Sequence, residues 1–283
     1  MSLVLTQYLE KLAPERTPLW IDAWDYGKTV LARGGQPPWG DVGEFVSYHR
    51  QLQSLVSSDI VVIELENFYQ FWLQLSPELK EAMAAKKRLG YALRTLLADA
   101  VSRQHLQEIV EALSGLYSDR PVLLAIPSPK HWMGIAYCQA HECSEVGVSW
   151  DDAESASMYV ADYLRNFAGC DISGLLLRDI TGPASDDDVA RYQPVLNVAE
   201  HYRWQVVLDG CRGDYQPGPA QGVSVCLSAN AGDRSSPKIS LDAWPGRPVL
   251  QPPLVYLNIP ASAVPESVLE CLQTANADLV RNA

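Results

Sequence analysis

Short apolar runs that end in polar residues recur along the chain, and eight of them have the length of a β-strand. Most are continuous in Val, Ile and Leu rather than strictly alternating, which is typical of strands buried on both faces of a parallel sheet. The runs are Pro18–Asp25, Asp59–Glu66, Pro121–Pro127, Gly174–Ile180, Gln205–Cys211, Gly222–Ser228, Lys238–Trp244 and Leu254–Pro260.

Segments long enough for helices separate most of these runs. Residues 41–56 carry apolar side chains at helical spacing, and a longer helical stretch with a break near Gly90 runs from 76 to 117. Ser149 and Ser185 each precede acidic residues, as an N-cap precedes a negatively charged first turn, and Pro265 begins the last helix. Strands that alternate with helices predict βαβ units, and eight strands predict an α/β fold of the TIM-type (β/α)8 barrel class, with residues 1–283 as a single domain.

Two late connections are short for this fold. Arg212–Gln221 and Ala229–Pro237 are rich in Gly, Pro and Ser and have too few residues for a full helix. We therefore expect a barrel with shortened late connections, and an open doubly wound sheet is the structural alternative.

Charge and composition narrow the function classes. The chain has 22 Lys and Arg against 34 Asp and Glu, a net charge of −12, which repels phosphate backbones and argues against nucleic-acid binding. No apolar run approaches the roughly 20 residues that span a bilayer, and the first residues lack a signal-peptide core. Six cysteines in 283 residues do not form a disulfide framework. We expect a cytoplasmic protein with a small-molecule substrate; the sequence does not decide between a monomer and a homodimer.

Polar residues gather at the ends of the apolar runs, where a parallel barrel has its active site. A carboxylate there lies in a low-dielectric rim that shifts its pKa, and carboxylates beside an arginine, a lysine and a histidine could hold a polar substrate and move a proton. For each residue alone, a rim salt bridge or a helix cap is the favoured explanation, whereas the convergence of so many of them favours an active site for the set as a whole. The set is Asp22, Trp24, Asp25, Glu64, Glu66, Ser128, Lys130, His131, Arg178, Asp179, Asp209, Cys211, Arg212, Cys226, Ser228, Asn230, Asp242, Trp244 and Asn258.

Asp22 and Asp25 share one short run with two tryptophans. Strand periodicity places Asp22 and Trp24 on one face and Asp25 on the other. A carboxylate beside an indole would have a raised pKa suited to acid catalysis; equally, Trp24 would plug the barrel mouth and Asp25 would cap the next loop.

Metal and nucleophile motifs are weak. Cys138, His141 and Cys143 form the one compact Cys/His cluster, but a fourth zinc ligand is not evident and the segment also resembles a helix end. Cys211 and Cys226 follow neighbouring runs and could bring two thiols to a pocket. The chain contains neither a nucleophile elbow nor a P-loop nor a dinucleotide fingerprint. We expect no cofactor, with zinc as the alternative.

The order of these segments resembles the uroporphyrinogen decarboxylase-like superfamily over roughly residues 9–279. This barrel group also contains methyltransferases that act on cobalamin or thiol acceptors. RTPLWIDAWDYGKTVLARGG is similar to its first strand and substrate-binding loop, and SSDIVVIELENF to its second strand, which ends in a catalytic aspartate. PVLLAIPSPKHWMGIAY, LLLRDITG and LVYLNIPASAVPESV resemble its third strand with the following loop, a later strand that ends in an aspartate, and its closing strand.

The resemblance implies particular site residues. Glu66 is the nearest equivalent of the catalytic aspartate, with Glu64 as the alternative, and Tyr137 and Asp179 correspond to a substrate-contacting tyrosine and a strand-end aspartate. The first loop departs from the decarboxylases, because Asp22 stands where they use arginines to hold carboxylate arms. The family's late histidine is replaced by Asn258.

Taken with the rim residues, the resemblance implies a metal-independent decarboxylase for a small or polycyclic carboxylated substrate. In that hypothesis Glu66 or Asp22 stabilises a substrate cation or relays a proton, Arg178 or Lys130 binds the carboxylate, and His131 or Tyr137 donates the proton. Trp24, Asp25, Asp209 and Asn258 complete the binding site. The alternatives are a zinc- or cobalamin-linked methyltransferase, whose metal would need Asp209, Cys211 and Cys226, and a non-catalytic binding barrel.

Overall fold

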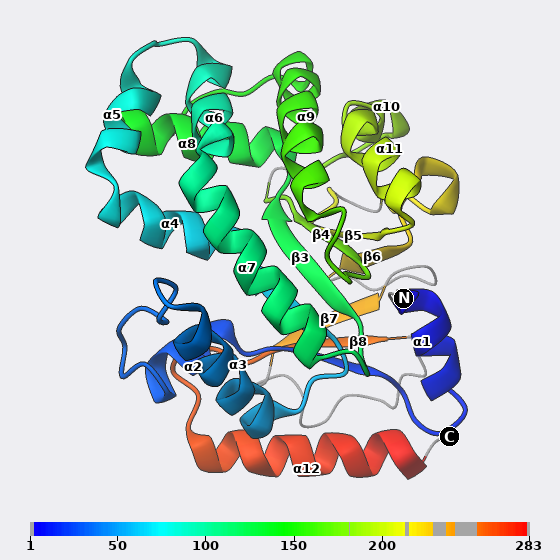
Figure 1. Cartoon of the computed structure of the whole chain (residues 1–283). Coiled ribbons are helices and arrows are strands. Elements are labelled where there is room, and N and C mark those ends of the chain that lie inside the picture. The colour runs from blue at the N-terminus through cyan, green and yellow to red at the C-terminus, as the bar shows by residue number, and fades with distance from the viewer. Residues whose placement is uncertain (1–2, 181, 213–214, 229–235, 241–253, 282–283) are drawn as a thin grey trace.

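The computed structural model describes residues 3–180, 182–212, 215–228, 236–240 and 254–281. Within them, eight parallel strands form one sheet in the order β1-β8-β7-β6-β5-β4-β3-β2, and each overlaps one of the eight predicted runs (Figure 1). The strands are β1 (Leu19–Asp22), β2 (Val61–Glu64), β3 (Val122–Pro127), β4 (Gly174–Arg178), β5 (Gln205–Asp209), β6 (Val225–Ser228), β7 (Ser236–Ser240) and β8 (Val255–Asn258).

The strand order follows the chain. A doubly wound sheet reverses its order at a switch point, which this sheet does not do. Among the strand pairs of the described residues, a ladder between β1 and β2, which would complete a barrel, is absent. The predicted α/β class with a parallel sheet is therefore confirmed, whereas a complete (β/α)8 barrel stays a prediction.

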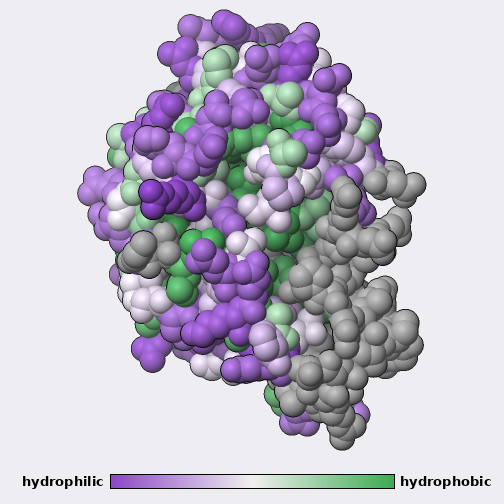
Figure 2. All heavy atoms as spheres, turned by 90° about the vertical axis from the view of Figure 1, so that its right-hand side faces the viewer, coloured by the Kyte–Doolittle hydropathy of each residue, from purple (hydrophilic) through white to green (hydrophobic). Residues whose placement is uncertain are grey.

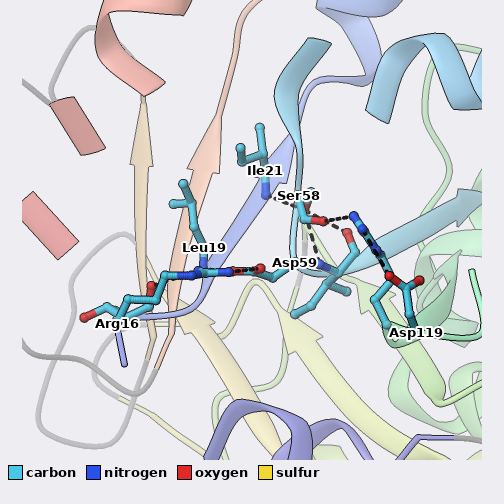
Figure 3. A network of polar contacts seen from close by, with 9 residues as sticks. Arg16, Leu19, Ile21, Ser58, Asp59 and Asp119 are labelled. Carbon is cyan, nitrogen blue, oxygen red and sulfur yellow. Dashed lines mark hydrogen bonds and ion pairs between the residues drawn. The ribbon is translucent and has the colours of Figure 1, made fainter. Parts of the chain in front are cut away.

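Side chains join the two strands that lack a ladder. The turn before β2 supplies them: Asp59 Oδ2 accepts from the Leu19 amide at 2.7 Å, and Ser58 Oγ accepts from the Ile21 amide at 2.9 Å (Figure 3). The Asp59 amide donates to the Leu19 carbonyl at 3.0 Å, and Arg16 pairs with the same carboxylate at 2.5 Å. These bonds satisfy backbone donors of β1 that a neighbouring strand would otherwise satisfy.

One face of the sheet encloses an apolar core that α1 (Leu5–Leu12) covers at the N-terminal ends of the strands. Leu5 and Leu9 pack there, and the Thr6 amide donates to Gln205 Oε1 at the start of β5. The core members are Leu5, Leu9, Trp20, Ile60, Leu123, Ala125, Leu176, Val207, Leu227, Leu254 and Tyr256. Because strand side chains alternate between faces, the residues two positions further along these strands belong to the same interior.

Helices pack on the other face of the sheet, and the last helix, α12, lies along β8 and β1 (Figure 1). Its residues Val268 and Leu272 belong to the same buried apolar cluster as Leu19 and Val255. The helices between are α2 (Trp24–Val30), α3 (Val42–Val56), α4 (Leu65–Leu75), α5 (Pro77–Ala84), α6 (Leu89–Ala98), α7 (Ala100–Leu116), α8 (Pro129–His141), α9 (Trp150–Leu164), α10 (Asp186–Ala190) and α11 (Gln193–Tyr202), followed by α12 (Pro265–Arg281).

Two helix starts follow the predicted caps, Ser149 and Ser185, and a third helix begins after Asp41. Asp41, Ser149 and Ser185 each accept a backbone hydrogen bond at a helix start, and Ser149 forms a capping box with Asp152. The stretch 76–117 was predicted to have one break, near Gly90, but it forms three helices. One ends at Ala84, the next begins at Leu89, and Asp99 caps the third. The described part of the connection 212–221 contains a 3₁₀ turn, Pro219–Gln221, in place of a full helix, in line with the short length of the connection.

Hydrophilic side chains cover most of the described surface on the face in Figure 2. None of the described helices is both long enough and apolar enough to cross a bilayer.

Candidate active site at the strand ends

An arginine surrounded by carboxylates lies at the C-terminal ends of the strands. Arg178 at the end of β4 is 2.5 Å from Glu64 of β2, 3.2 Å from Asp22 of β1 and 3.5 Å from Asp209 of β5. Only 8% of the Glu64 side chain and 25% of the Arg178 side chain are exposed. Four strands therefore contribute charged groups to one largely buried cluster, which we name the Arg178 cluster and to which Tyr256 also belongs.

Strand periodicity explains why these residues meet. Arg178 follows the interior residue Leu176 by two positions, and Asp209 follows Val207 in the same way. Arg178 and Asp209 are also paired directly in the β4–β5 register. The parallel arrangement brings all these strand ends to one edge, so the interior face ends in a polar layer.

Tyr256 of β8 completes the cluster. Its hydroxyl donates to Asp22 Oδ2 and accepts from Arg178 Nη1 at 3.3 Å. The Trp24 amide donates to Asp22 Oδ1 at 3.3 Å. Asp22 is thus fixed by a cation, a phenol and a backbone donor.

Burial and charge shift the pKa values of the two carboxyls in opposite directions. Burial raises the pKa of Glu64, although Arg178 opposes this. Burial also acts on Asp22, but the Arg178 charge and the Tyr256 hydrogen bond together hold its pKa below the ordinary value. Counted over the described residues, three carboxyl groups face one guanidinium, so this part of the cluster carries an excess of negative charge when they are ionised.

A small cavity adjoins the cluster at the side where β1 faces β2. Its volume is about 30 Å³, and Trp20, Trp24, His49, Glu64 and Arg178 are among its lining residues. This is room for one water-sized group. Burial lowers the pKa of His49 to about 4, so its ring is neutral at pH 7.

Asp22, Arg178 and Asp209, all predicted from the sequence, are brought together in this cluster. Glu66 lies elsewhere: it is in the first turn of α4 and accepts a hydrogen bond from Gln70. Helix α4 begins directly after β2, so the last strand residue, Glu64, is the one that faces the interior.

Asp179 also lies apart from the cluster. It follows Arg178 on the opposite face, is 2% exposed, and accepts a hydrogen bond from Tyr192 at 2.5 Å, beside α11. Strand alternation explains this, because consecutive residues point to opposite faces.

Trp24 and Asp25 belong to α2 rather than to the strand. Trp24 packs against Trp39, with ring centroids 5.4 Å apart, and also lines the small cavity. Asp25 is exposed and pairs with Lys28 at 2.8 Å. Because β1 ends at Asp22, the strand alternation used to place these two side chains does not extend to them.

Three predicted residues lie on α8, outside the cluster. Lys130 Nζ is 4.1 Å from the centroid of the Trp150 ring, and the Tyr137 ring packs on His141 at 4.4 Å. His131 and Lys130 line a separate open cavity of about 550 Å³. Ser128 caps α8 immediately after β3, so these side chains are on a helix and not at a strand end.

Asn258 pairs with Asp22 in the β1–β8 register and is half-buried beside the cluster. Among the strand-end residues of the sequence set, Asn230, Asp242 and Trp244 lie outside the described residues.

The alternative zinc ligands do not form one site. Cys211 and Cys226 have their Sγ atoms 3.4 Å apart, but Cys226 pairs with Leu208 and Asp209 with Leu227, so Asp209 and Cys226 point to opposite faces of the sheet. The described part of the chain contains no group of three or more His, Cys, Asp and Glu side chains placed to hold a metal. A catalytic zinc takes three protein ligands, so these residues do not fit it and we derive no step through zinc.

Tyr256 is the cluster residue that sequence reasoning missed. Its signal was present in the closing run LVYLNIP, where it stands two positions before Asn258 and therefore on the same face.

Comparison with known proteins supports the fold and little else. No family model matches the chain, and no curated protein matches it. Among solved structures, a methyltransferase from Methanosarcina mazei is similar with a TM-score of 0.57 and 12% sequence identity; the match covers 98% of this chain and 99% of that one. At this identity the likeness shows a shared fold along the whole chain.

Proposed function

We propose that this chain is a methyltransferase with its active site at the Arg178 cluster, and that its methylated substrate is cationic or neutral. The excess of carboxyl groups over arginine in a buried site carries this proposal. The likeness to a methyltransferase structure along nearly the whole chain supports it. Closure of the strands into a complete barrel belongs to the same proposal.

The charge of the cluster argues for this function over decarboxylation. A carboxylated substrate would have to approach Asp22, Glu64 and Asp209, and Arg178, the cation that the described residues bring to this site, already contacts all three. Like charges a few ångströms apart in a site of low dielectric repel strongly. An onium group, with a methyl on positively charged nitrogen or sulfur, would instead be attracted.

The chemistry that follows is a displacement at the methyl carbon. The acceptor heteroatom forms a bond to the methyl carbon while the bond to the onium nitrogen or sulfur breaks, and the leaving group departs as a neutral amine or sulfide. A thiol acceptor loses its proton in this step. Glu64 is suited to receive that proton because burial raises its pKa towards the working pH. Asp22 and Tyr256 hold Arg178 in position.

The proposal is tested by binding and by transfer. The protein is titrated with tetramethylammonium and trimethylsulfonium, and separately with acetate and benzoate, by isothermal titration calorimetry. Methyl transfer from ¹³C-labelled trimethylsulfonium to 2-mercaptoethanol is followed by NMR. We expect the cations to bind in preference to the carboxylates, and E64Q to lower the transfer rate by at least about 10²-fold, the lower range for lost general acid–base catalysis.

The matched control is D162N, because Asp162 is an exposed aspartate whose side chain is 81% accessible. It should leave transfer unchanged. Preferential binding of the carboxylates, with release of carbon dioxide, would contradict the methyltransferase proposal and support a decarboxylase instead. Absence of both binding and transfer would refute the methyltransferase proposal and favour the alternative of a non-catalytic barrel.

A further inference from the structure

We propose that Cys138 and Cys143 form a reversible redox site, a dithiol that a small anionic disulfide oxidises to an intramolecular disulfide. The site is on α8, away from the Arg178 cluster, and it is independent of the proposed methyl transfer. It rests on the approach of the two sulfurs, the turn that holds them, and the cavity that they line.

The two sulfurs lie 2.9 Å apart, closer than the van der Waals contact of two sulfur atoms. Both cysteines are free and half-buried. A disulfide bond would require the sulfurs to close to about 2.05 Å, a small movement from this position.

The end of helix α8 produces this approach. Glu142 has a left-handed conformation with φ of 54°, and the Cys143 amide donates to the Cys138 carbonyl at 3.3 Å. This is the 6→1 bond of a Schellman turn, which folds the residue after the left-handed one back onto the last helical turn. An apolar contact commonly joins those two positions; here both positions are cysteines.

The thiols line the open cavity of about 550 Å³ on the outer side of α8. Its wall has three basic side chains, Lys130, His131 and Arg212, against one acidic side chain, Glu145, and Ile135 and Ile180 bring apolar surface. Ile180 is 80% exposed. In a chain with a net charge of −12, this combination favours an anionic ligand with an apolar part, such as a peptide disulfide that carries carboxylates.

The reaction balances as two thiol–disulfide exchanges. The Cys143 thiolate attacks one sulfur of the external disulfide, forms a mixed disulfide and expels one thiolate. The Cys138 thiolate then attacks Cys143 Sγ, forms the internal disulfide and expels the second thiolate. The protein loses two protons and two electrons, and the external disulfide is reduced to two thiols. Burial and the adjacent thiol raise the pKa of Cys138 to about 11, which disfavours Cys138 as the first nucleophile.

A second sulfur pair provides the internal comparison. Cys211 and Cys226 have their sulfurs 3.4 Å apart, but Cys226 is 3% exposed and is held on a strand. An external disulfide should therefore react with it far more slowly.

The experiment treats the full chain with oxidised glutathione under native conditions, blocks remaining thiols with iodoacetamide, and maps the products by peptide mass spectrometry. We expect a Cys138–Cys143 disulfide that dithiothreitol reverses. C138S should stop at a stable glutathione adduct on Cys143, and C143S should form neither product at this site. C271S, a change in another half-buried cysteine, should behave as the unmodified chain does.

Two results would overturn the proposal. One is full alkylation of Cys138 and Cys143 after exposure to oxidised glutathione at concentrations that oxidise a control dithiol peptide. The other is oxidation at Cys211–Cys226 in preference to this pair. Circular dichroism of each variant establishes that the fold is intact, so that failure to fold is not taken for failure to react.

Discussion

Glu64 and Arg178 meet at 2.5 Å although they come from β2 and β4, strands that β3 separates in the sheet. Contact across an intervening strand requires both side chains to lie on the same face of the sheet. The ion pair therefore depends on the pairing of three strands as well as on the charge of the site. Its loss should affect both folding and ligand binding.

Replacing the arginine tests the structural part of this relationship. R178M leaves three buried carboxyl groups facing one another without a cation, and we expect it to lower the free energy of unfolding by about 3–5 kcal/mol. Urea denaturation measures the change. R165M, which removes an exposed partner of Asp162, should have little effect. An R178M protein as stable as R165M would show that the cluster contributes nothing to folding.

His49 should make stability depend on pH. Burial lowers its pKa from 6.5 to about 4 in the folded chain, so between these values the unfolded state binds a proton that the folded state does not. Stability that is present above pH 6.5 is therefore lost as the pH falls towards 4, by about 3 kcal/mol from this residue. H49Q should remove that part of the pH dependence, which urea denaturation across the range would show.

The matched control for His49 is H201Q, because His201 is exposed on α11. Its pH dependence should follow that of the unmodified chain. If H49Q keeps the same slope between pH 4 and 6.5, the folded chain protonates His49 without penalty and the burial argument is refuted.

Asp59 should be essential to the junction of β1 and β2. D59A leaves the buried Leu19 amide and the Arg16 guanidinium without their acceptor (Figure 3), and we expect a loss of about 2–3 kcal/mol. The comparison is D119A, which removes an exposed carboxylate 3.4 Å from Arg120. Thermal unfolding of the two variants should separate them clearly; equal melting temperatures would contradict the role given to Asp59.

Two glycines should respond oppositely to the same substitution. In G174A, the new Cβ would lie 2.0 Å from the Gln205 carbonyl oxygen on the paired strand, so β4 and β5 must separate and the protein should fold poorly. In G115A, near the end of α7, the new Cβ meets nothing within 4 Å and should stabilise the helix by about 0.5–1 kcal/mol. Chemical denaturation measures both, and tolerance of G174A would disprove the close approach.

The sequence predicted most of the parallel sheet because buried parallel strands leave an unambiguous apolar run. It predicted Asp22, Arg178 and Asp209 because each stands at the end of such a run. Asp25 and Glu66 were misplaced for a physical reason: helices begin directly after β1 and β2, so strand alternation ends earlier than the apolar pattern suggests.

Tyr256 shows what a linear pattern leaves out, whereas Glu64 was among the predicted strand-end residues. Tyr256 reads as one more apolar residue in a strand, and its contacts with Asp22 and Arg178 make its hydroxyl part of the cluster. Lys130 and His131 were assigned to the strand-end site because they follow β3 closely, and Tyr137 because of the family resemblance. Ser128 turns the chain into a helix, so Lys130 and His131 line a different cavity and Tyr137 packs on His141.

The position of helix α1 bears on the side from which a ligand can reach the Arg178 cluster. Leu5 and Leu9 cover the interior at the N-terminal ends of the strands, in the buried apolar cluster that also contains Trp20 and Tyr256. Within the described residues, apolar side chains therefore close the N-terminal ends of the strands, whereas the Arg178 cluster lies at their C-terminal ends. A ligand of the proposed site would reach it from the C-terminal side of the sheet, and a product retained there would compete with the next substrate.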